Sequence, residues 1–154
     1  MNIKIRKATS ADTRVIADFN ARMAEETEHR SLNAKVLSRG VRSILNDKGK
    51  GIYFVAEVGG AVVGQLMITY EWSDWRNGNF WWIQSVYVKK EFRQRGVFRS
   101  LYEHVEKLAK KNKRVCGLRL YVERENDRAQ ETYEKLGMKH SVYDMLEKEY
   151  TPRA

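Results

Sequence analysis

The stretch VYVKKEFRQRGVFRSLYEHV, residues 86–105, decides the fold because it joins a β-branched run to an amphipathic run through a basic loop. Val86–Val88 is expected at the end of a strand, and Phe98–Lys111 in the helix that follows. The intervening loop, Glu91–Val97, therefore lies at a helix N-terminus. Backbone N–H groups lack helical partners there and the helix dipole is positive, which suits a bound phosphate.

Gly96 and three arginines strengthen the phosphate interpretation of this loop. Gly96 has no side chain, so the backbone can approach a ligand closely. Arg93, Arg95 and Arg99 add positive charge around the same point. A solvated basic loop whose glycine serves only the turn explains the same residues equally well. The loop therefore has to be interpreted together with the rest of the chain.

The hydrophobic pattern elsewhere switches between a period of two and a period of 3.6 residues. Strands are expected at 3–6, 52–58, 61–70, 80–88 and 117–122, with one or two more in 138–150, and helices at 10–28, 33–45 and 127–136. Gly59-Gly60 favours a tight hairpin turn, and Asn126 and Gly137 begin and end the last helix. This order predicts a single mixed α/β domain over residues 1–154. Its α+β-like fold has a mostly antiparallel central sheet of about six or seven strands and helices on both faces.

The composition excludes several classes of protein. A chain of 154 residues is long enough for one domain with a core, and a single cysteine excludes an internal disulfide. No apolar run approaches the length of a membrane span. The charged N-terminus lacks the apolar centre of a signal peptide. We therefore expect a cytoplasmic protein without a membrane partner.

The formal net charge of +9 is compatible with binding to nucleic acid, to a membrane surface or to a phosphorylated ligand. A nucleic-acid-binding module predicts basic and aromatic residues together on one exposed face. Here the arginines gather at one helix start, and all four tryptophans lie in one hairpin, residues 71–82. We therefore expect no nucleic-acid partner.

The arginine-rich loop resembles the acetyl-CoA-binding motif of the GNAT superfamily of N-acetyltransferases. That motif reads Gln or Arg, two residues, Gly, one residue, then Gly or Ala. It maps onto Arg93-Gln94-Arg95-Gly96-Val97-Phe98. Phe98 departs from the motif, because a small residue is usual at that position.

A second segment, Leu120–Met138, resembles the downstream motif of the same superfamily. It contains a strand, then Asn126, then a helix carrying Ala129 and Tyr133, and it ends in Leu136-Gly137-Met138. The opening of the chain and the hairpin around Gly59-Gly60 also look like segments of this superfamily. The resemblance therefore covers nearly the whole chain, with two motifs in the correct order.

The resemblance implies that acetyl-CoA is the cofactor, and that its acetyl group moves directly from the thioester to a primary amine of a small molecule or a protein. The loop would hold the diphosphate, and the pantetheine arm would pair with the β-strand backbone of Val86 and Val88. The implied cofactor-binding residues are Val86, Tyr87, Val88, Arg93, Gln94, Arg95, Gly96, Val97, Phe98, Arg99, Ser100, Asn126 and Tyr133. A non-catalytic CoA-binding sensor or partner module of the same fold is the alternative.

Tyr133 is, by the same resemblance, the general acid that protonates the departing thiolate. Its other interpretation is a helix tyrosine that packs its ring in the core. The base is left open, because the position that holds a glutamate in similar polyamine acetyltransferases holds Gln84, which cannot take a proton. The alternatives are a water relay and the carboxylates of Glu26, Glu28, Glu71 and Asp74.

The acceptor amine is open among polyamine, amino acid, antibiotic, peptide N-terminus and protein lysine. Trp72 and Trp75 are expected on a loop, where they could line an acceptor pocket or pack at a subunit interface. The candidate substrate residues are Glu28, Glu71, Trp72, Trp75 and Gln84. The resemblance and the aromatic hairpin predict a homodimer. The three histidines lack metal-ligand spacing, so no metal site is expected.

Overall fold

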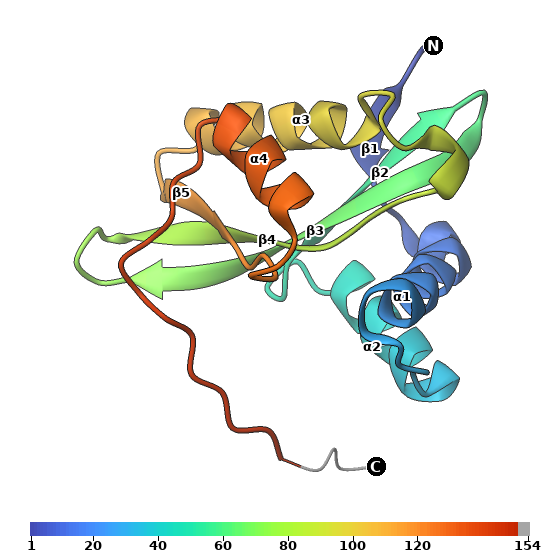
Figure 1. Cartoon of the computed structure of the whole chain (residues 1–154), viewed down its shortest axis with the longest axis horizontal. Coiled ribbons are helices and arrows are strands. Elements are labelled where there is room, and N and C mark those ends of the chain that lie inside the picture. The colour runs from blue at the N-terminus through green and yellow to red at the C-terminus, as the bar shows by residue number, and fades with distance from the viewer. Residues whose placement is uncertain (151–154) are drawn as a thin grey trace. The chain divides into compact units, whose positions relative to one another are not determined.

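A computed structural model describes residues 1–150 of the chain (Figure 1). The chain divides into two compact units, Met1–Tyr121 and Val122–Ala154. The first unit contains β1 (Lys4–Lys7), α1 (Thr13–Glu28), α2 (Ala34–Leu45), β2 (Ile52–Val58), β3 (Ala61–Ser73), β4 (Gly78–Val88), α3 (Val97–Lys111) and β5 (Val115–Leu120). The second contains α4 (Asp127–Lys135). The single domain predicted over residues 1–154 stays a prediction, and its last four residues lie outside the described part.

The sheet of the first unit has the strand order β1-β2-β3-β4-β5. The first three pairs are antiparallel, whereas β4 and β5 run parallel. In Figure 1, α1 and α2 lie on one side of the sheet and α3 on the other. The predicted mixed α/β class with a mostly antiparallel sheet is therefore confirmed.

Alternate side chains of strand β2 pack on opposite faces of the sheet. Tyr53 and Val55 are buried in a cluster with Ile16 of α1 and Val41 of α2. Phe54, which points to the opposite face, packs edge-on against His104 of α3, with ring centroids 5.4 Å apart. Alternate side chains of one strand therefore hold helices on opposite faces of the sheet.

Helix α3 packs unusually close to the sheet at Gly64 of β3. A Cβ atom at Gly64 would lie 2.9 Å from the Val97 Cγ1 atom and 3.3 Å from the Tyr87 carbonyl oxygen. Val97, Leu101 and Val105 form the buried face of the helix. A glycine at position 64 therefore lets the first turn of α3 approach β3 and β4, and this fixes where the helix begins.

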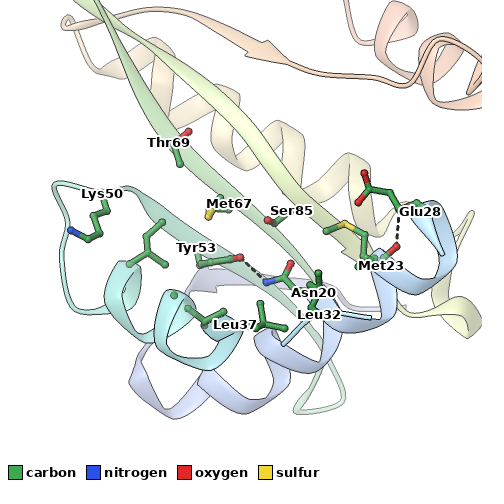
Figure 2. A pocket seen from close by; sticks show the side chains of 15 residues that line it. Asn20, Met23, Glu28, Leu32, Leu37, Lys50, Tyr53, Met67, Thr69 and Ser85 are labelled. Atoms are coloured by element: carbon green, nitrogen blue, oxygen red, sulfur yellow. Dashed lines mark hydrogen bonds between the residues drawn. The ribbon is translucent and has the colours of Figure 1, made fainter. Parts of the chain in front are cut away.

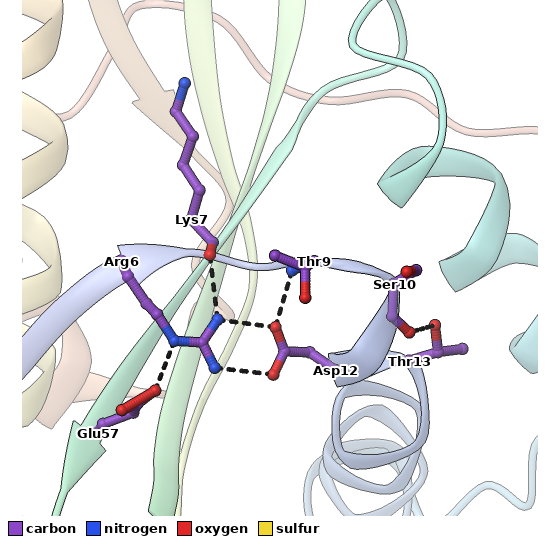
Figure 3. A network of polar contacts seen from close by, with 7 residues as sticks. All are labelled: Arg6, Lys7, Thr9, Ser10, Asp12, Thr13 and Glu57. Carbon is purple, nitrogen blue, oxygen red and sulfur yellow. Dashed lines mark hydrogen bonds and ion pairs between the residues drawn. The ribbon is translucent and has the colours of Figure 1, made fainter. Parts of the chain in front are cut away.

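A polar network ties β1 to the start of α1 (Figure 3). The Arg6 guanidinium binds both oxygens of Asp12, at 2.8 and 2.9 Å, and also donates to Glu57 of β2. The same carboxylate accepts a hydrogen bond from the Thr9 backbone N–H at 2.8 Å. Asp12 is only 6% exposed, and these hydrogen bonds, led by that from Arg6, lower its pKa. The network therefore orients α1, which carries part of the site described below.

We expect Asp12→Ala to lower the free energy of unfolding by about 3 kcal/mol, because it removes the charge-assisted hydrogen bonds from the half-buried Arg6 guanidinium and leaves the Thr9 N–H unpaired. For a chain of this size the melting temperature should fall by about 6–12 °C. Asp18→Ala is the matched control, since it removes an exposed pair with Arg22 on the same helix and should change little. Thermal unfolding of the three proteins by circular dichroism measures both effects.

The Asp12 contribution should also depend on pH. Its folded-state pKa is lowered, so its contribution is complete above the unfolded pKa of about 3.9 and is lost as the pH falls through the folded value. The stability difference between the unmodified protein and Asp12→Ala should therefore be constant near pH 7 and shrink below about pH 4. A difference that grows on acidification would contradict this assignment.

The prediction of six or seven strands is wrong for the described residues, which form five. Residues 138–150, expected to hold one or two strands, contain none. The apolar side chains of that segment from Val142 on, including Leu146, are exposed. A strand needs a partner for its backbone groups, and Asp, Glu and Lys, common in this segment, are unfavourable in strands. The alternation of residue types alone therefore overpredicted the sheet.

The β3–β4 hairpin is longer than the sequence indicated. β3 continues to Ser73 and β4 begins at Gly78, so only residues 74–77 form the turn. Trp72, expected on a loop, pairs with Asn79 within the hairpin.

Within residues 1–150 no helix combines the length and the apolar composition needed to cross a bilayer.

The second unit contains a short capped helix. The Asn126 side chain accepts a hydrogen bond from the Ala129 N–H at 3.1 Å, and α4 follows directly. Gly137 takes a positive φ of 95°, and the Met138 N–H donates to the Tyr133 carbonyl oxygen at 3.0 Å. The predicted start and stop signals of this helix are therefore confirmed.

Candidate active site

Strand β4 is irregular where the cofactor was expected. Register with β3 shifts between the pairs Met67–Gln84 and Gln65–Tyr87, so that β4 contains a bulge. Ser85, inside the bulge, has a positive φ of 50°, which is uncommon for a residue with a side chain. The pairing of β4 with β5 ends at Ile83. Strand β5 ends at Leu120, the partner of Ile83, so among the described strands β4 has no neighbour on that side beyond Ile83, and an extended ligand can pair with its backbone there.

A buried polar network supports the bulge. Gln65 is fully buried, and its Nε2 atom donates to the Ser85 carbonyl oxygen at 3.0 Å and to Asn20 Oδ1 at 3.1 Å. Asn20 Nδ2 in turn donates to the Tyr53 hydroxyl at 3.0 Å. Burial raises the pKa of Tyr53, while hydrogen bonding with Ser85 and Asn20 acts in the opposite direction. The Tyr53 hydroxyl therefore stays protonated at neutral pH, and the bulge is linked to α1.

A pocket of about 680 Å³ lies beside the bulge (Figure 2). Helix α1 contributes Asn20, Met23 and Glu28 to its lining, α2 contributes Leu37, Val41 and Ile44, and the sheet contributes Tyr53, Met67, Thr69 and Ser85. Figure 2 shows Lys50 and Glu28 at opposite ends. Ser85 belongs both to the pocket lining and to the bulge. A ligand in the pocket would therefore lie next to the part of β4 that has no β5 partner.

The loop before α3 contains two residues with a left-handed backbone conformation. Gly96 has a φ of +84° and directly precedes the helix, and Gln94 has a φ of +63°. A Cβ atom at Gly96 would have no neighbour within 4 Å among the described residues. Glycine is therefore favoured there by the left-handed backbone, and the space around it is open to a ligand.

The three arginines of the loop differ in their contacts. Arg93 donates to the Val88 carbonyl oxygen at 2.8 Å and to Glu26 Oε2 at 2.7 Å, so it ties the end of β4 to the end of α1. Arg95 lies over the Phe92 ring at 5.9 Å. Arg99 pairs with Glu103 at 2.9 Å in an exposed pair, which a phosphate can displace at small cost. Arg95 and Arg99 are therefore better placed than Arg93 to meet an anion.

The other predicted cofactor residues of the first unit are buried or half-buried. Tyr87 is buried, with its ring centroid 5.0 Å from that of Phe19, and Val97 is buried in the first turn of α3. Val86, Val88, Phe98 and Ser100 are half-buried. The Ser100 N–H donates to the Gly96 carbonyl oxygen at 3.0 Å, the first hydrogen bond of the helix.

The two predicted residues of the second unit are both on or beside α4. Asn126 caps the helix with its side-chain oxygen. Tyr133 is half-buried, and burial raises the pKa of its hydroxyl. A tyrosine with a raised pKa holds its proton at neutral pH, as a general acid must.

The predicted substrate residues separate into two groups. Glu28 lines the pocket, and Gln84 donates to Thr69, which also lines it. Glu71 instead accepts hydrogen bonds from Trp82 at 3.0 Å and Arg119 at 2.7 Å, and these, led by the bond from Trp82, lower its pKa. Trp72 and Trp75 are 59% and 85% exposed and do not line this pocket.

Sequence reasoning missed Asn20, Tyr53, Gln65 and Ser85. Two of them carried a signal that was available. Asn20 interrupts the apolar stripe that begins at Ile16, and Gln65 stands alone in the apolar run VVGQLMI. A polar residue in a core position needs buried partners, and such networks are often functional.

Among the described residues, no group of three or more His, Cys, Asp or Glu side chains could hold a metal ion.

Comparison with known proteins agrees with this geometry. Residues 16–138 match the model of the acetyltransferase (GNAT) family. A possible acetyltransferase from Clostridium difficile 630 is 48% identical, with a TM-score of 0.91 over 99% of this chain and 100% of that one. No curated protein matches the chain.

More distant structures share the fold. A transcriptional regulator from Bacillus halodurans C-125 is 21% identical, with a TM-score of 0.81 over 97% of this chain and 100% of that one. A predicted acetyltransferase from Clostridium acetobutylicum, solved with acetyl-CoA, is 16% identical, with a TM-score of 0.78 over 96% of each chain. Together with the family match over most of its length, these similarities lead to one conclusion: the chain belongs to the GNAT family of acetyltransferases.

Proposed function

We propose that the protein transfers the acetyl group of acetyl-CoA to a primary amine. The observation that carries this proposal is the end of the β4–β5 pairing at Ile83, beside a bulge whose Ser85 also lines the pocket. This arrangement brings together an exposed strand edge, suited to the amide-containing pantetheine arm, and a cavity suited to an acceptor. Acetyl-CoA is bound in the fold relative from Clostridium acetobutylicum, which supports the choice of cofactor.

Cofactor binding in this proposal uses the backbone more than the side chains. The diphosphate lies at the loop of Gly96, where the start of α3 and the charges of Arg95 and Arg99 favour an anion. The pantetheine arm follows the backbone of Val86–Val88. Arg93 adds positive charge near the diphosphate without a direct hydrogen bond to it, because its guanidinium already donates to the Val88 carbonyl oxygen and to Glu26. By the family resemblance, Asn126 and Tyr133 also belong to the cofactor site.

The chemistry is one acyl transfer. The neutral amine nitrogen attacks the thioester carbonyl carbon, a C–N bond forms, the C–S bond breaks, and the amine loses one proton. Tyr133 donates its proton to the thiolate that leaves. The amine proton goes to water or to the carboxylate of Glu28, because Gln84 cannot accept it, and a proton from water then restores the Tyr133 hydroxyl. The products are the acetamide and free CoA.

Release of the CoA thiol tests this function. We expect acetyl-CoA alone to be stable in the presence of the protein, and free thiol to accumulate when a primary amine is added. The assay uses a thiol reagent and a panel of alkylamines, polyamines, aminoglycosides, amino acids and lysine peptides. Acetyl-CoA binding without amine-dependent thiol release from any member would favour the non-catalytic CoA-binding module instead.

A further inference from the structure

The walls of the pocket are mainly apolar, and this restricts the acceptor. Met23, Leu32, Leu37, Val41, Ile44 and Met67 line it. Val41 is buried in the same cluster as Tyr53, so this wall belongs to the packed core beneath α1 and α2. The Tyr53 and Asn20 side chains, which supply polar atoms, already hydrogen bond with one another. A ligand body that enters the pocket therefore meets hydrocarbon on most sides.

The charges of the pocket lining are few. Among the described residues that line the pocket, Glu28 is the only carboxylate, and Lys50, at the other end in Figure 2, is the only cation. The neighbouring carboxylate of Glu26 is engaged by Arg93 at 2.7 Å. Lys50 is itself paired with Asp47 at 3.2 Å. An ammonium group removed from water needs a partner, so the pocket can pair one ammonium group and not several.

We propose that the acceptor is a small monoamine with an apolar body, such as an alkylamine or arylalkylamine, and not a polycation. This inference rests on the proposed acetyl transfer at the same site. The amine meets Glu28 at the mouth while still charged, and the apolar body enters between α1, α2 and β3. A polyamine or an aminoglycoside would leave additional ammonium groups against hydrocarbon, near a protein of net charge +9. In a protein lysine the stem behind the amine leads to the polypeptide backbone, whose polar groups would enter the apolar pocket without partners.

The test is the chain-length dependence of kcat/KM for n-alkylamines from propylamine to hexylamine. Each added methylene that enters the pocket should raise kcat/KM roughly fourfold. Hexylamine and 2-phenylethylamine should exceed spermidine, kanamycin and a lysine peptide by on the order of 100-fold. A flat alkyl series, or a preference for a polycation or the lysine peptide, would overturn the proposal.

Two variants at position 23 test whether the α1 wall of the pocket causes the dependence of kcat/KM on alkyl chain length. Met23 lines the pocket from α1 and is half-buried. Met23→Gln keeps the length of the side chain but adds an amide, so the slope with chain length should flatten. Met23→Leu keeps an apolar wall and should retain the slope. Equal slopes in the two variants would show that the alkyl chain binds elsewhere.

A measurement of amine binding shows whether the monoamine inference or the proposed acetyl transfer is wrong, because it does not depend on catalysis. In protein labelled with ¹³C at the methionine methyl groups, hexylamine should shift the NMR signals of Met23 and Met67, whereas spermidine at equal concentration should not. Loss of a signal in Met23→Leu assigns that residue. If no amine releases thiol yet hexylamine shifts both signals, the acetyl transfer is wrong and the monoamine pocket stands. If thiol is released but spermidine gives the larger shifts, the monoamine assignment is wrong.

Discussion

Replacing Gly96 by glutamate is expected to abolish binding of acetyl-CoA, with a loss of affinity on the order of 100-fold or more. Position 96 has a φ of +84°, and its Cβ direction is open, so a glutamate side chain would point into the space proposed for the diphosphate. The new carboxylate would repel the phosphates and draw the charges of Arg95 and Arg99 away from them. Isothermal titration calorimetry with acetyl-CoA measures the change.

Two further variants separate charge from backbone strain in this experiment. Gly60 in the β2–β3 turn has a φ of +80° and an equally open Cβ direction. Gly60→Glu therefore imposes similar strain and the same charge away from the proposed site, and it should bind acetyl-CoA normally. Gly96→Ala keeps the strain without the charge and should bind more weakly than the unmodified protein but better than Gly96→Glu. Normal binding by Gly96→Glu would show that the diphosphate lies elsewhere.

Replacing Tyr133 by phenylalanine is expected to lower kcat about 10²- to 10⁴-fold, the usual contribution of a general acid. The substitution keeps the ring and removes only the hydroxyl, so the fold should survive. Acetyl-CoA affinity should change little, because the diphosphate is proposed to bind at the Gly96 loop. A group used only in the transition state lowers kcat and kcat/KM together.

The control for Tyr133 is Tyr143→Phe, which removes the same hydroxyl from an exposed residue of the same unit. Its kcat should be normal. The melting temperature of both variants is measured beside the kinetics, because a tyrosine that only packs would show a small loss of stability and near-normal turnover. That second pattern would remove Tyr133 from the mechanism. Burial raises the Tyr133 pKa, so the rate of the unmodified protein should not fall from loss of its proton until well above neutral pH.

Local signals explain why much of the framework could be predicted from the sequence. The cap at Asn126, the stop at Gly137 and the positive φ at Gly96 are properties of a few consecutive residues. The amphipathic stripe of α3 likewise depends only on its own spacing. These features position the loop proposed to hold the cofactor, so that the loop and its helix were placed correctly before any contact was known.

Contacts between distant residues explain what the sequence did not reveal. The bulge at Ser85 depends on register with β3 and on the buried amide of Gln65, and Arg93 meets Glu26 across 67 residues of chain. The pocket requires α1, α2 and the sheet to be assembled around Tyr53. The strands expected in residues 138–150 were overpredicted for a related reason, since the alternation of residue types along one segment does not tell whether a partner strand is present.

Transfer of a labelled acetyl group tests the central claim most directly. The protein is incubated with acetyl-CoA labelled in its acetyl group and with hexylamine or another amine from the panel, and the products are analysed by mass spectrometry. The account predicts a labelled acetamide and free CoA in equal amounts, with neither formed when the protein or the amine is omitted. Binding of acetyl-CoA without labelled acetamide from any amine would contradict it.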